Sequence, residues 1–232
     1  MRPARGFSLV ELTVVIGIVV LLAGLTISAG TAVVRNAEHR ATETALVQLD
    51  AAVREWELLA DRKLTWAEPG EQAEVHAGTP EVLIITEILD VVTRNAAGRD
   101  FIAHIDPDLV YRYEDDTAPW LSSPMEMSEV NDRFIGSLTV LDAWGTPVYA
   151  THPGRTWAPD DGPDRDDDGT IRTRNEKDYG ISPNRRIVFV SAGPDQRFGL
   201  PMEFSAPDAE QIRAARLDNV YSVPVKFGPD ED

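Results

Sequence analysis

The feature that most constrains this chain is a long uncharged stretch near its N-terminus. No charged residue occurs from Leu12 through Val34, where Val, Ile, Leu, Ala and Gly predominate. As a helix rising about 1.5 Å per residue, this stretch covers roughly 34 Å, enough to cross a bilayer core of about 30 Å. Arg2 and Arg5 precede it, so the positive-inside rule predicts one span with a cytoplasmic N-terminus and the rest of the chain exported.

The overall composition excludes several classes of function. The 232 residues include 39 acidic and 22 basic side chains, for a net charge of −17. A surface this acidic repels phosphate backbones, so we expect no nucleic-acid partner. The chain has no cysteine, which excludes disulfides, thiolate metal sites and cysteine nucleophiles.

The junction before the apolar stretch carries an unusual acid. Glu11 directly precedes Leu12 at the start of the apolar helix, and an unpaired charge in such a helix costs up to about 3 kcal/mol at the bilayer centre and less near the interface. The string R-G-F-S-L-V-E-L, from Arg5 to Leu12, resembles the processing site of type IV prepilins and type II secretion pseudopilins. A plain signal anchor with a chance glutamate is the alternative interpretation.

The resemblance implies a processing pathway and a set of partners. In that family a prepilin peptidase cuts after the glycine, here Gly6, and methylates the new N-terminal residue, here Phe7. Glu11 would pair with the N-terminal ammonium of a neighbouring subunit and set the register of a helical filament. The implied partners are other pseudopilin subunits, the prepilin peptidase, an inner-membrane assembly platform and the membrane itself. The implied location is the inner membrane, with a periplasmic C-terminal domain that joins a filament after assembly.

The helical pattern continues beyond the apolar stretch. Apolar residues recur at steps of three and four, which predicts one helix from Phe7 to about Asp61. That apolar stripe comprises Leu46, Leu49, Val53, Trp56 and Ala60. The chain therefore divides into a leader (1–6), a transmembrane or filament-core helix (7–34), its amphipathic continuation (35–62) and a globular domain (63–232).

The remainder of the chain predicts a small sheet. Thr79-Pro80-Glu81 is a helix start, and the second helix is expected to stop near Gly98. Short strands are predicted at 137–141, 147–150, 186–191 and 220–225. The predicted fold class is therefore α+β, with a long N-terminal helix packed on a small antiparallel sheet, as in type IV pilin-like proteins.

Three segments of the C-terminal half resemble the major pseudopilin of type II secretion. They are D-A-W-G-T-P from Asp142, S-A-G-P-D-Q-R-F-G from Ser191 and L-D-N-V-Y-S from Leu217. In that subunit the region binds a structural calcium ion, and the resemblance implies that Asp195 and Asp218 supply carboxylate ligands. A metal-free network of turns is the alternative.

A second acidic segment has the spacing of a calcium loop. Asp164, Asp166 and Asp168 fill the first, third and fifth places of half an EF-hand loop, and glycine fills the sixth. The twelfth place is Asn175 rather than glutamate, so the loop is not a complete EF-hand. A solvated acidic loop is the alternative.

No pattern of catalytic residues accompanies these motifs. The four histidines are dispersed, and neither H-E-x-x-H nor G-x-S-x-G occurs. We therefore predict a non-enzymatic pseudopilus subunit that supports protein export. Two alternatives stay open: a type IV pilus minor pilin or competence pseudopilin, and a membrane-anchored calcium-dependent hydrolase or binding module.

Overall fold

The structure is a computed structural model of the chain. The described residues are 9–64, 66–67, 75–76, 81–113, 136–151, 164–165, 171–172, 179–180, 186–200, 203 and 208–227. The chain divides into two compact units, Met1–Arg40 and Ala41–Asp232.

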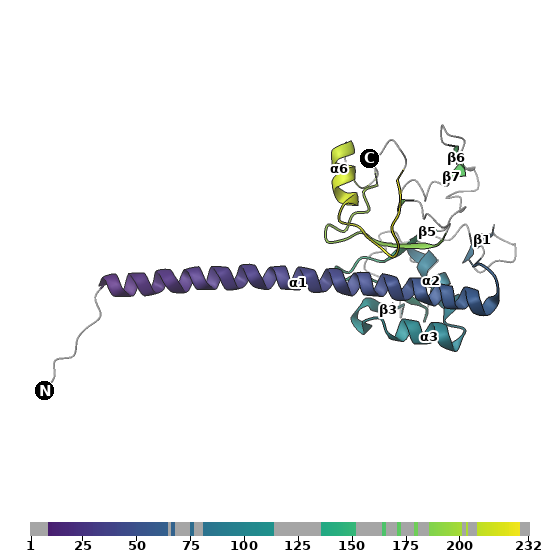
Figure 1. The fold of residues 1–232 in the computed structure, drawn as a ribbon, viewed down its shortest axis with the longest axis horizontal. Helices are drawn as coiled ribbons and strands as arrows, with labels where there is room; N and C mark the ends of the chain where they lie inside the picture. Colours follow the sequence, from purple (N-terminus) through teal and green to yellow (C-terminus); the bar gives the residue numbers. More distant parts are fainter. Residues whose placement is uncertain are drawn as a thin grey trace. The chain divides into compact units, whose positions relative to one another are not determined.

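The longest element is helix α1, Leu9–Ala60 (Figure 1). Predicted from Phe7 to about Asp61, it ends at Ala60, and Asp61 follows with a positive φ of 51°. No glycine or proline interrupts it between Thr31 and Ala60, which suits an uninterrupted helix. Within the first unit, every large apolar side chain described between Leu9 and Val34 is at least half exposed. This surface requires a cover of lipid or other protein.

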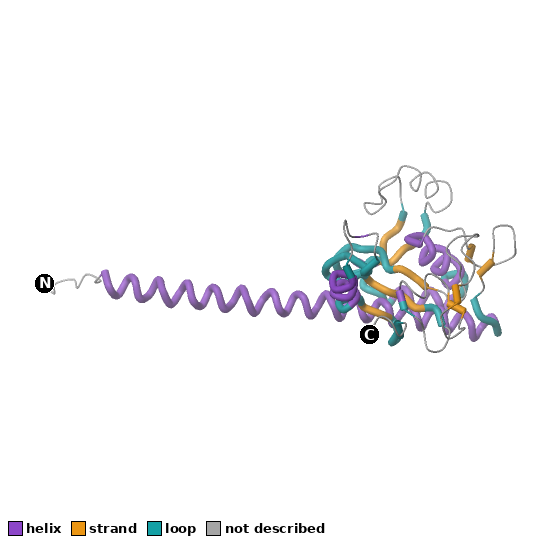
Figure 2. The backbone as a smooth tube through the Cα atoms, turned by 90° about the horizontal axis from the view of Figure 1, so that it is seen from above, coloured by secondary structure: helices purple, strands orange, loops and turns teal. Residues whose placement is uncertain are grey.

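The second unit holds the remaining helices and several small sheets, distinguished by colour in Figure 2. The helices are α2 (Glu81–Val92), α3 (Ala96–Ala103), the 3₁₀ turn η1 (Pro107–Leu109) and α6 (Ala209–Arg216). The strands are β1 (Trp66–Ala67), β2 (Val75–His76), β3 (Val110–Arg112), β4 (Leu138–Val140), β5 (Tyr149–Thr151), β6 (Asp164–Arg165), β7 (Ile171–Arg172), β8 (Val188–Ser191) and β9 (Val220–Tyr221). The pairs β3–β4, β5–β8, β8–β9 and β6–β7 are antiparallel, and β1–β2 is parallel. The predicted α+β class is confirmed.

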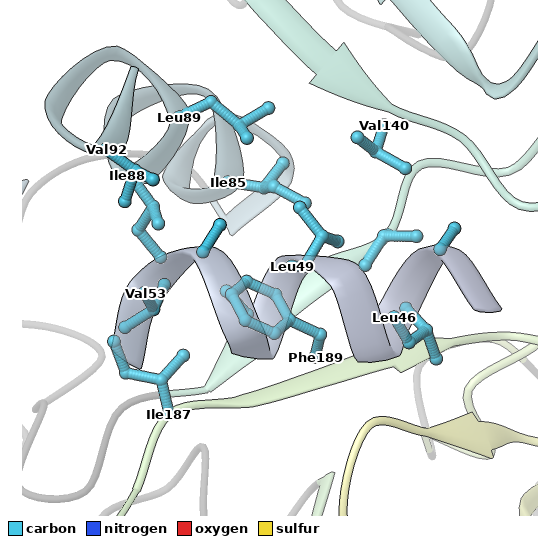
Figure 3. Packing of buried hydrophobic residues seen from close by; sticks show 14 of the residues in the cluster. Leu46, Leu49, Val53, Ile85, Ile88, Leu89, Val92, Val140, Ile187 and Phe189 are labelled. Atoms are coloured by element: carbon cyan, nitrogen blue, oxygen red, sulfur yellow. The ribbon is translucent and has the colours of Figure 1, made fainter. Parts of the chain in front are cut away.

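One hydrophobic core joins helix and sheet within the second unit (Figure 3). Leu46, Leu49 and Val53 of α1 are buried, as the predicted stripe requires, and Trp56 packs at the edge of the cluster. They meet residues of α2 and β8, among them Ile85 and Phe189. Burying a large aliphatic side chain contributes about 1.5–3 kcal/mol, so this cluster is the main attachment of the amphipathic half-helix to its domain.

The second helix is shorter than predicted. It ends at Val92 rather than near Gly98, and Gly98 lies inside the separate helix α3. Asn95 caps α3, and its side chain accepts a 2.6 Å hydrogen bond from the Gly98 N–H. A Cβ at position 98 would lie 2.1 Å from the Val92 carbonyl oxygen. Glycine is therefore needed for close approach of the two helices, and the sequence-based interpretation mistook that role for a helix stop.

The strand predictions were correct in place and approximate in length. Predicted 137–141, 147–150 and 186–191 correspond to β4, β5 and β8, whereas predicted 220–225 contracts to the two residues of β9. Strand β8 is buried on both faces and lacks the alternation that a half-exposed strand shows. Elements that were not predicted are α3, η1, α6 and the short strands β1, β2, β3, β6 and β7.

An ionic contact links the C-terminal half of α1 to the segment that directly precedes β8. Asp50 is only 9% exposed and pairs with Arg54 at 2.7 Å, the i,i+4 pair expected on this helix. Its other carboxylate oxygen accepts a hydrogen bond from Arg186. Asp50 therefore links segments that lie 136 residues apart in the chain.

Candidate functional site

The turn between β4 and β5 is organised by one buried carboxylate. Asp142 is 2% exposed, and its Oδ1 accepts hydrogen bonds from the main-chain N–H groups of Trp144 (3.0 Å) and Thr146 (2.8 Å). Gly145 supplies the positive φ of 84° that the turn requires. The Ala143 N–H donates to the Thr42 hydroxyl of α1 at 3.0 Å. The D-x-W-G-x-P segment is thus a self-capped turn that is also bonded to the amphipathic half-helix.

Burial changes the acidity of this carboxyl group. Desolvation raises the pKa of Asp142 above its ordinary value, because the buried carboxylate loses water. The hydroxyl of Ser191 and the main-chain N–H donors oppose that rise, because they stabilise the charged form. The Asp142 Oδ2 accepts from the Ser191 hydroxyl at 2.7 Å. Asp142 thereby connects the first predicted motif to the second.

The second motif folds into a tight turn after β8. Ser191 Oγ also accepts from the Gly193 N–H at 3.1 Å. Gly193 has a φ of 72°, and a Cβ there would lie 2.4 Å from the Asp218 carbonyl oxygen. Only glycine therefore satisfies both the conformation and the contact with the third motif.

A glutamine occupies a place where glycine is common in the family that the motif resembles. Gln196 adopts a φ of 59°, which explains why glycine suits this position. Its side-chain Nε2 donates to the Trp144 carbonyl at 2.7 Å. The departure from the motif therefore adds a bond between the first and second segments.

The third motif closes the cluster from the C-terminal side. Asn219 Nδ2 donates to the Phe198 carbonyl at 3.1 Å and contacts the Tyr221 hydroxyl at 3.2 Å. Val220 pairs with Ser191 in the β8–β9 ladder. Helix α6 forms the connection between motifs two and three, in the stretch that separated them in the sequence. We call the three segments 142–147, 191–199 and 217–222 together the loop cluster.

Three side chains of the loop cluster, those of Asp195, Asp218 and Asn219, carry oxygens of the type that a hard cation takes as ligands. Burial, and secondarily the negative charge of Asp195, raise the pKa of Asp218, so the two predicted ligands lie close enough to repel. Asp218 Oδ1 and Asn219 Oδ1 are buried, and neither has a hydrogen-bond partner. Asp195 Oδ1 accepts from the Arg197 N–H at 2.8 Å, which fixes that side chain in the turn. An all-oxygen donor set of this kind suits calcium, which takes six to eight oxygen ligands.

Asn219 is the residue that reasoning from sequence missed. The resemblance implied only Asp195 and Asp218 as ligands and gave Asn219 no role in cation binding. Its orphaned oxygen follows from the orientation that its Nδ2 contacts impose. Its place directly after Asp218 was the available signal. In the part of the chain that the structure describes, no three His, Asp or Glu side chains gather as a metal-binding group.

The second acidic segment is described only in its flanking strands. Strand β6 pairs with β7 in antiparallel fashion, so that Asp164 lies opposite Arg172 and Arg165 opposite Ile171. The side chain of Asp164, and the whole of Asp166 and Asp168, lie outside the described residues.

The predicted processing residues are placed as follows. Gly6 and Phe7 lie outside the described residues, and Glu11 belongs to α1 although its side chain is not described. Of the described helices, one is long and apolar enough to cross a membrane, with a mean hydropathy of 2.6 in its most apolar window. That criterion rests on length and composition alone.

Comparison with known proteins adds no assignment. No protein-family model, curated protein or solved structure matches this chain. What the fold itself defines is an α+β chain with one long N-terminal apolar helix and small antiparallel sheets. This layout is compatible with a pilin-like fold.

Proposed function

We propose that this chain is a structural subunit of a type II secretion pseudopilus, cleaved after Gly6, methylated at Phe7 and assembled into a helical filament that supports protein export. The observation that carries the proposal is the bare apolar surface of α1 from Leu9 to Val34. Such a surface is stable in a bilayer before assembly and against other copies of the same helix after it.

The amphipathic half of the helix supports the same proposal. Within the second unit, Leu46, Leu49 and Val53 face their own domain and are buried. One helix therefore contains an uncovered segment and a domain-packed segment. This arrangement suits a filament in which the uncovered helical segments associate at the core and the globular domains lie on the outer surface.

The loop cluster supports the choice of a major-pseudopilin-like subunit. Its three segments lie far apart in the sequence, and each resembles a segment of the major pseudopilin. They contact one another through Asp142, Ser191 and Asn219. We propose that calcium binds at Asp195 and Asp218 with Asn219, relieves their repulsion and rigidifies the cluster. The role is structural, and the proposal assigns no enzymatic step.

Glu11 has the decisive role in assembly under this proposal. In a low-dielectric filament core its carboxylate would pair with the methylated ammonium of a neighbouring Phe7. The prepilin peptidase, an inner-membrane platform and other pseudopilins are the partners that this requires. The N-terminus would be cytoplasmic before cleavage, and the C-terminal domain periplasmic.

Cysteine cross-linking in the producing cells tests assembly. The chain has no native cysteine, so no other thiol in it can react with a cross-linker. The double substitution Ile16→Cys with Ile27→Cys introduces two thiols at exposed apolar positions. A bismaleimide is expected to give a ladder of multimers, and adding Glu11→Leu is expected to abolish it while leaving membrane insertion intact. A ladder that persists with Glu11→Leu, or no multimer in either protein, would contradict filament assembly through Glu11.

A further inference from the structure

A cavity that shares no lining residue with the loop cluster lies in the first half of the domain. It measures about 700 Å³, is open to solvent and is lined by the end of α2, by α3 and by the β3–β4 pair. Its aliphatic lining consists of Leu89, Ile102, Ala103, Ile105, Pro107, Val110 and Leu138. No residue of the loop cluster lines it. The volume falls within the range of about 300–1,000 Å³ typical of small-molecule sites.

Two guanidinium groups line this cavity from different elements. Arg99 of α3 donates through Nη1 to the carbonyls of Thr93 (2.9 Å) and Arg94 (3.3 Å). Arg112 of β3 donates through Nη1 to the Gly136 carbonyl. A guanidinium has five N–H donors, and these contacts use only one nitrogen of each group. The anchors hold both groups in place and leave donors available.

Neither cation is neutralised within the described part of the chain. Arg99 and Arg112 form no ion pair there, although acidic side chains outnumber basic ones by 39 to 22 in the whole protein. Asp90 also lines the cavity, but its carboxylate is paired with Arg94 at 2.6 Å. The charged side chains of the lining are therefore two arginines and one aspartate, and the rest of the lining is mostly aliphatic.

We propose that this cavity binds a small aliphatic carboxylate. The carboxylate would accept charge-assisted hydrogen bonds from Arg99 and Arg112, whose planar donor geometry matches two carboxylate oxygens. The hydrocarbon chain would lie against the more exposed lining residues Ala103, Val110 and Leu138. This binding site is independent of filament assembly and of the loop cluster.

Equilibrium dialysis of the full chain in lipid nanodiscs against radiolabelled octanoate tests the proposal, with empty nanodiscs subtracted. Saturable binding of one octanoate per chain is expected. Arg99→Gln with Arg112→Gln should weaken it at least about tenfold, because the charge-assisted bonds are lost. Ala103→Trp should abolish binding by filling the cavity, since Ala103 is exposed and its replacement removes no core contact. Arg213→Gln, a charge change on α6 outside the cavity, should bind as the parent does.

Melting temperatures show which variants fold. If the double arginine variant does not fold, the proposal is tested by Ala103→Trp alone. Binding that fails to saturate, or that Ala103→Trp leaves unchanged, would overturn the proposal. Octanamide is expected to bind at least about tenfold more weakly than octanoate, because it lacks the charge. Equal binding of octanamide would also overturn it. The proposal would also be overturned if a short peptide that ends in leucine binds and octanoate does not, because the site would then recognise a protein C-terminus.

Discussion

The Ser191 hydroxyl donates a 2.7 Å hydrogen bond to the Asp142 carboxylate and joins two turns that lie 49 residues apart in the chain. Both groups are buried, and the same carboxylate caps its own turn through Trp144 and Thr146. Loss of the Asp142 carboxylate would leave the Ser191 hydroxyl and the Trp144 and Thr146 N–H groups without their acceptor. Asp142 therefore holds together the part of the domain on which the proposed cation site depends.

Replacing Asp142 by alanine is expected to destabilise the domain by about 2–4 kcal/mol, because several buried donors lose their acceptor. Urea denaturation of residues 36–232, which include the whole second unit, measures this change. Asp195→Ala is the matched control, because Asp195 is exposed and caps only its own turn. Equal losses in the two variants would show that Asp142 has no special role.

The pH dependence of stability should reveal the buried Asp142 carboxyl. Its folded pKa lies above the ordinary value of about 3.9, so the native state holds this proton more tightly than the unfolded chain. The associated stabilisation is fully present below about pH 3.9 and is lost as pH rises through the raised folded pKa. Asp142→Asn cannot titrate. The unfolding free energy of the parent minus that of Asp142→Asn should therefore fall as pH rises from about 3.5, and a difference that grows with pH would contradict the assignment.

Calcium should stabilise residues 36–232 through the loop cluster. At about 100 times its dissociation constant, one bound ion contributes about 2.7 kcal/mol, or a rise in melting temperature of roughly 5–10 °C. Asp218→Asn should abolish this rise. In chelator the same variant should melt above the parent, because it removes the repulsion with Asp195.

The second acidic segment provides the matched control for that measurement. Asp166→Asn with Asp168→Asn should leave the calcium-induced rise intact if the loop cluster is the site. A rise that survives Asp218→Asn but disappears in this control would move the ion to 164–168. No rise in the parent would exclude both calcium proposals.

Asp50 should contribute to stability through its contact with Arg186 more than through its contact with Arg54. Asp50→Ala removes a carboxylate that accepts from both, and is expected to cost about 1–3 kcal/mol. Arg54→Ala should cost less than about 1 kcal/mol, because the Arg54 side chain is 52% exposed and solvent screens its pair. Thermal or urea unfolding of the two variants decides this, and a larger loss for Arg54→Ala would refute it.

The elements predicted well from the sequence are those whose pattern is local. The stripe Leu46, Leu49 and Val53 and the pair Asp50–Arg54 follow from helical periodicity alone, and both are present. The contact of Asp50 with Arg186 spans 136 residues, and no local pattern encodes it. The α+β class was predictable because a long amphipathic helix and short strands separated by turns have few arrangements in which their apolar faces are buried against each other.

The errors in the prediction arise from glycine and from short elements. Gly98 was interpreted as a helix stop, whereas its role is to admit the Val92 carbonyl. Strand β3 has only three residues and α6 only eight, too short for periodicity to identify. In the candidate site, resemblance supplied Asp195 and Asp218. The oxygen of Asn219 needed the structure, because its availability depends on which way its amide is held.

The central claim, that this chain is processed as a prepilin and built into a filament, is tested most directly by the intact mass and N-terminal sequence of the protein recovered from its native membranes. The account predicts a chain that begins at Phe7 and is heavier by one methyl group. In a Gly6→Ala variant, cleavage should fail and the chain should keep Met1. A parent chain that begins at Met1, or at any residue other than Phe7, would contradict the account.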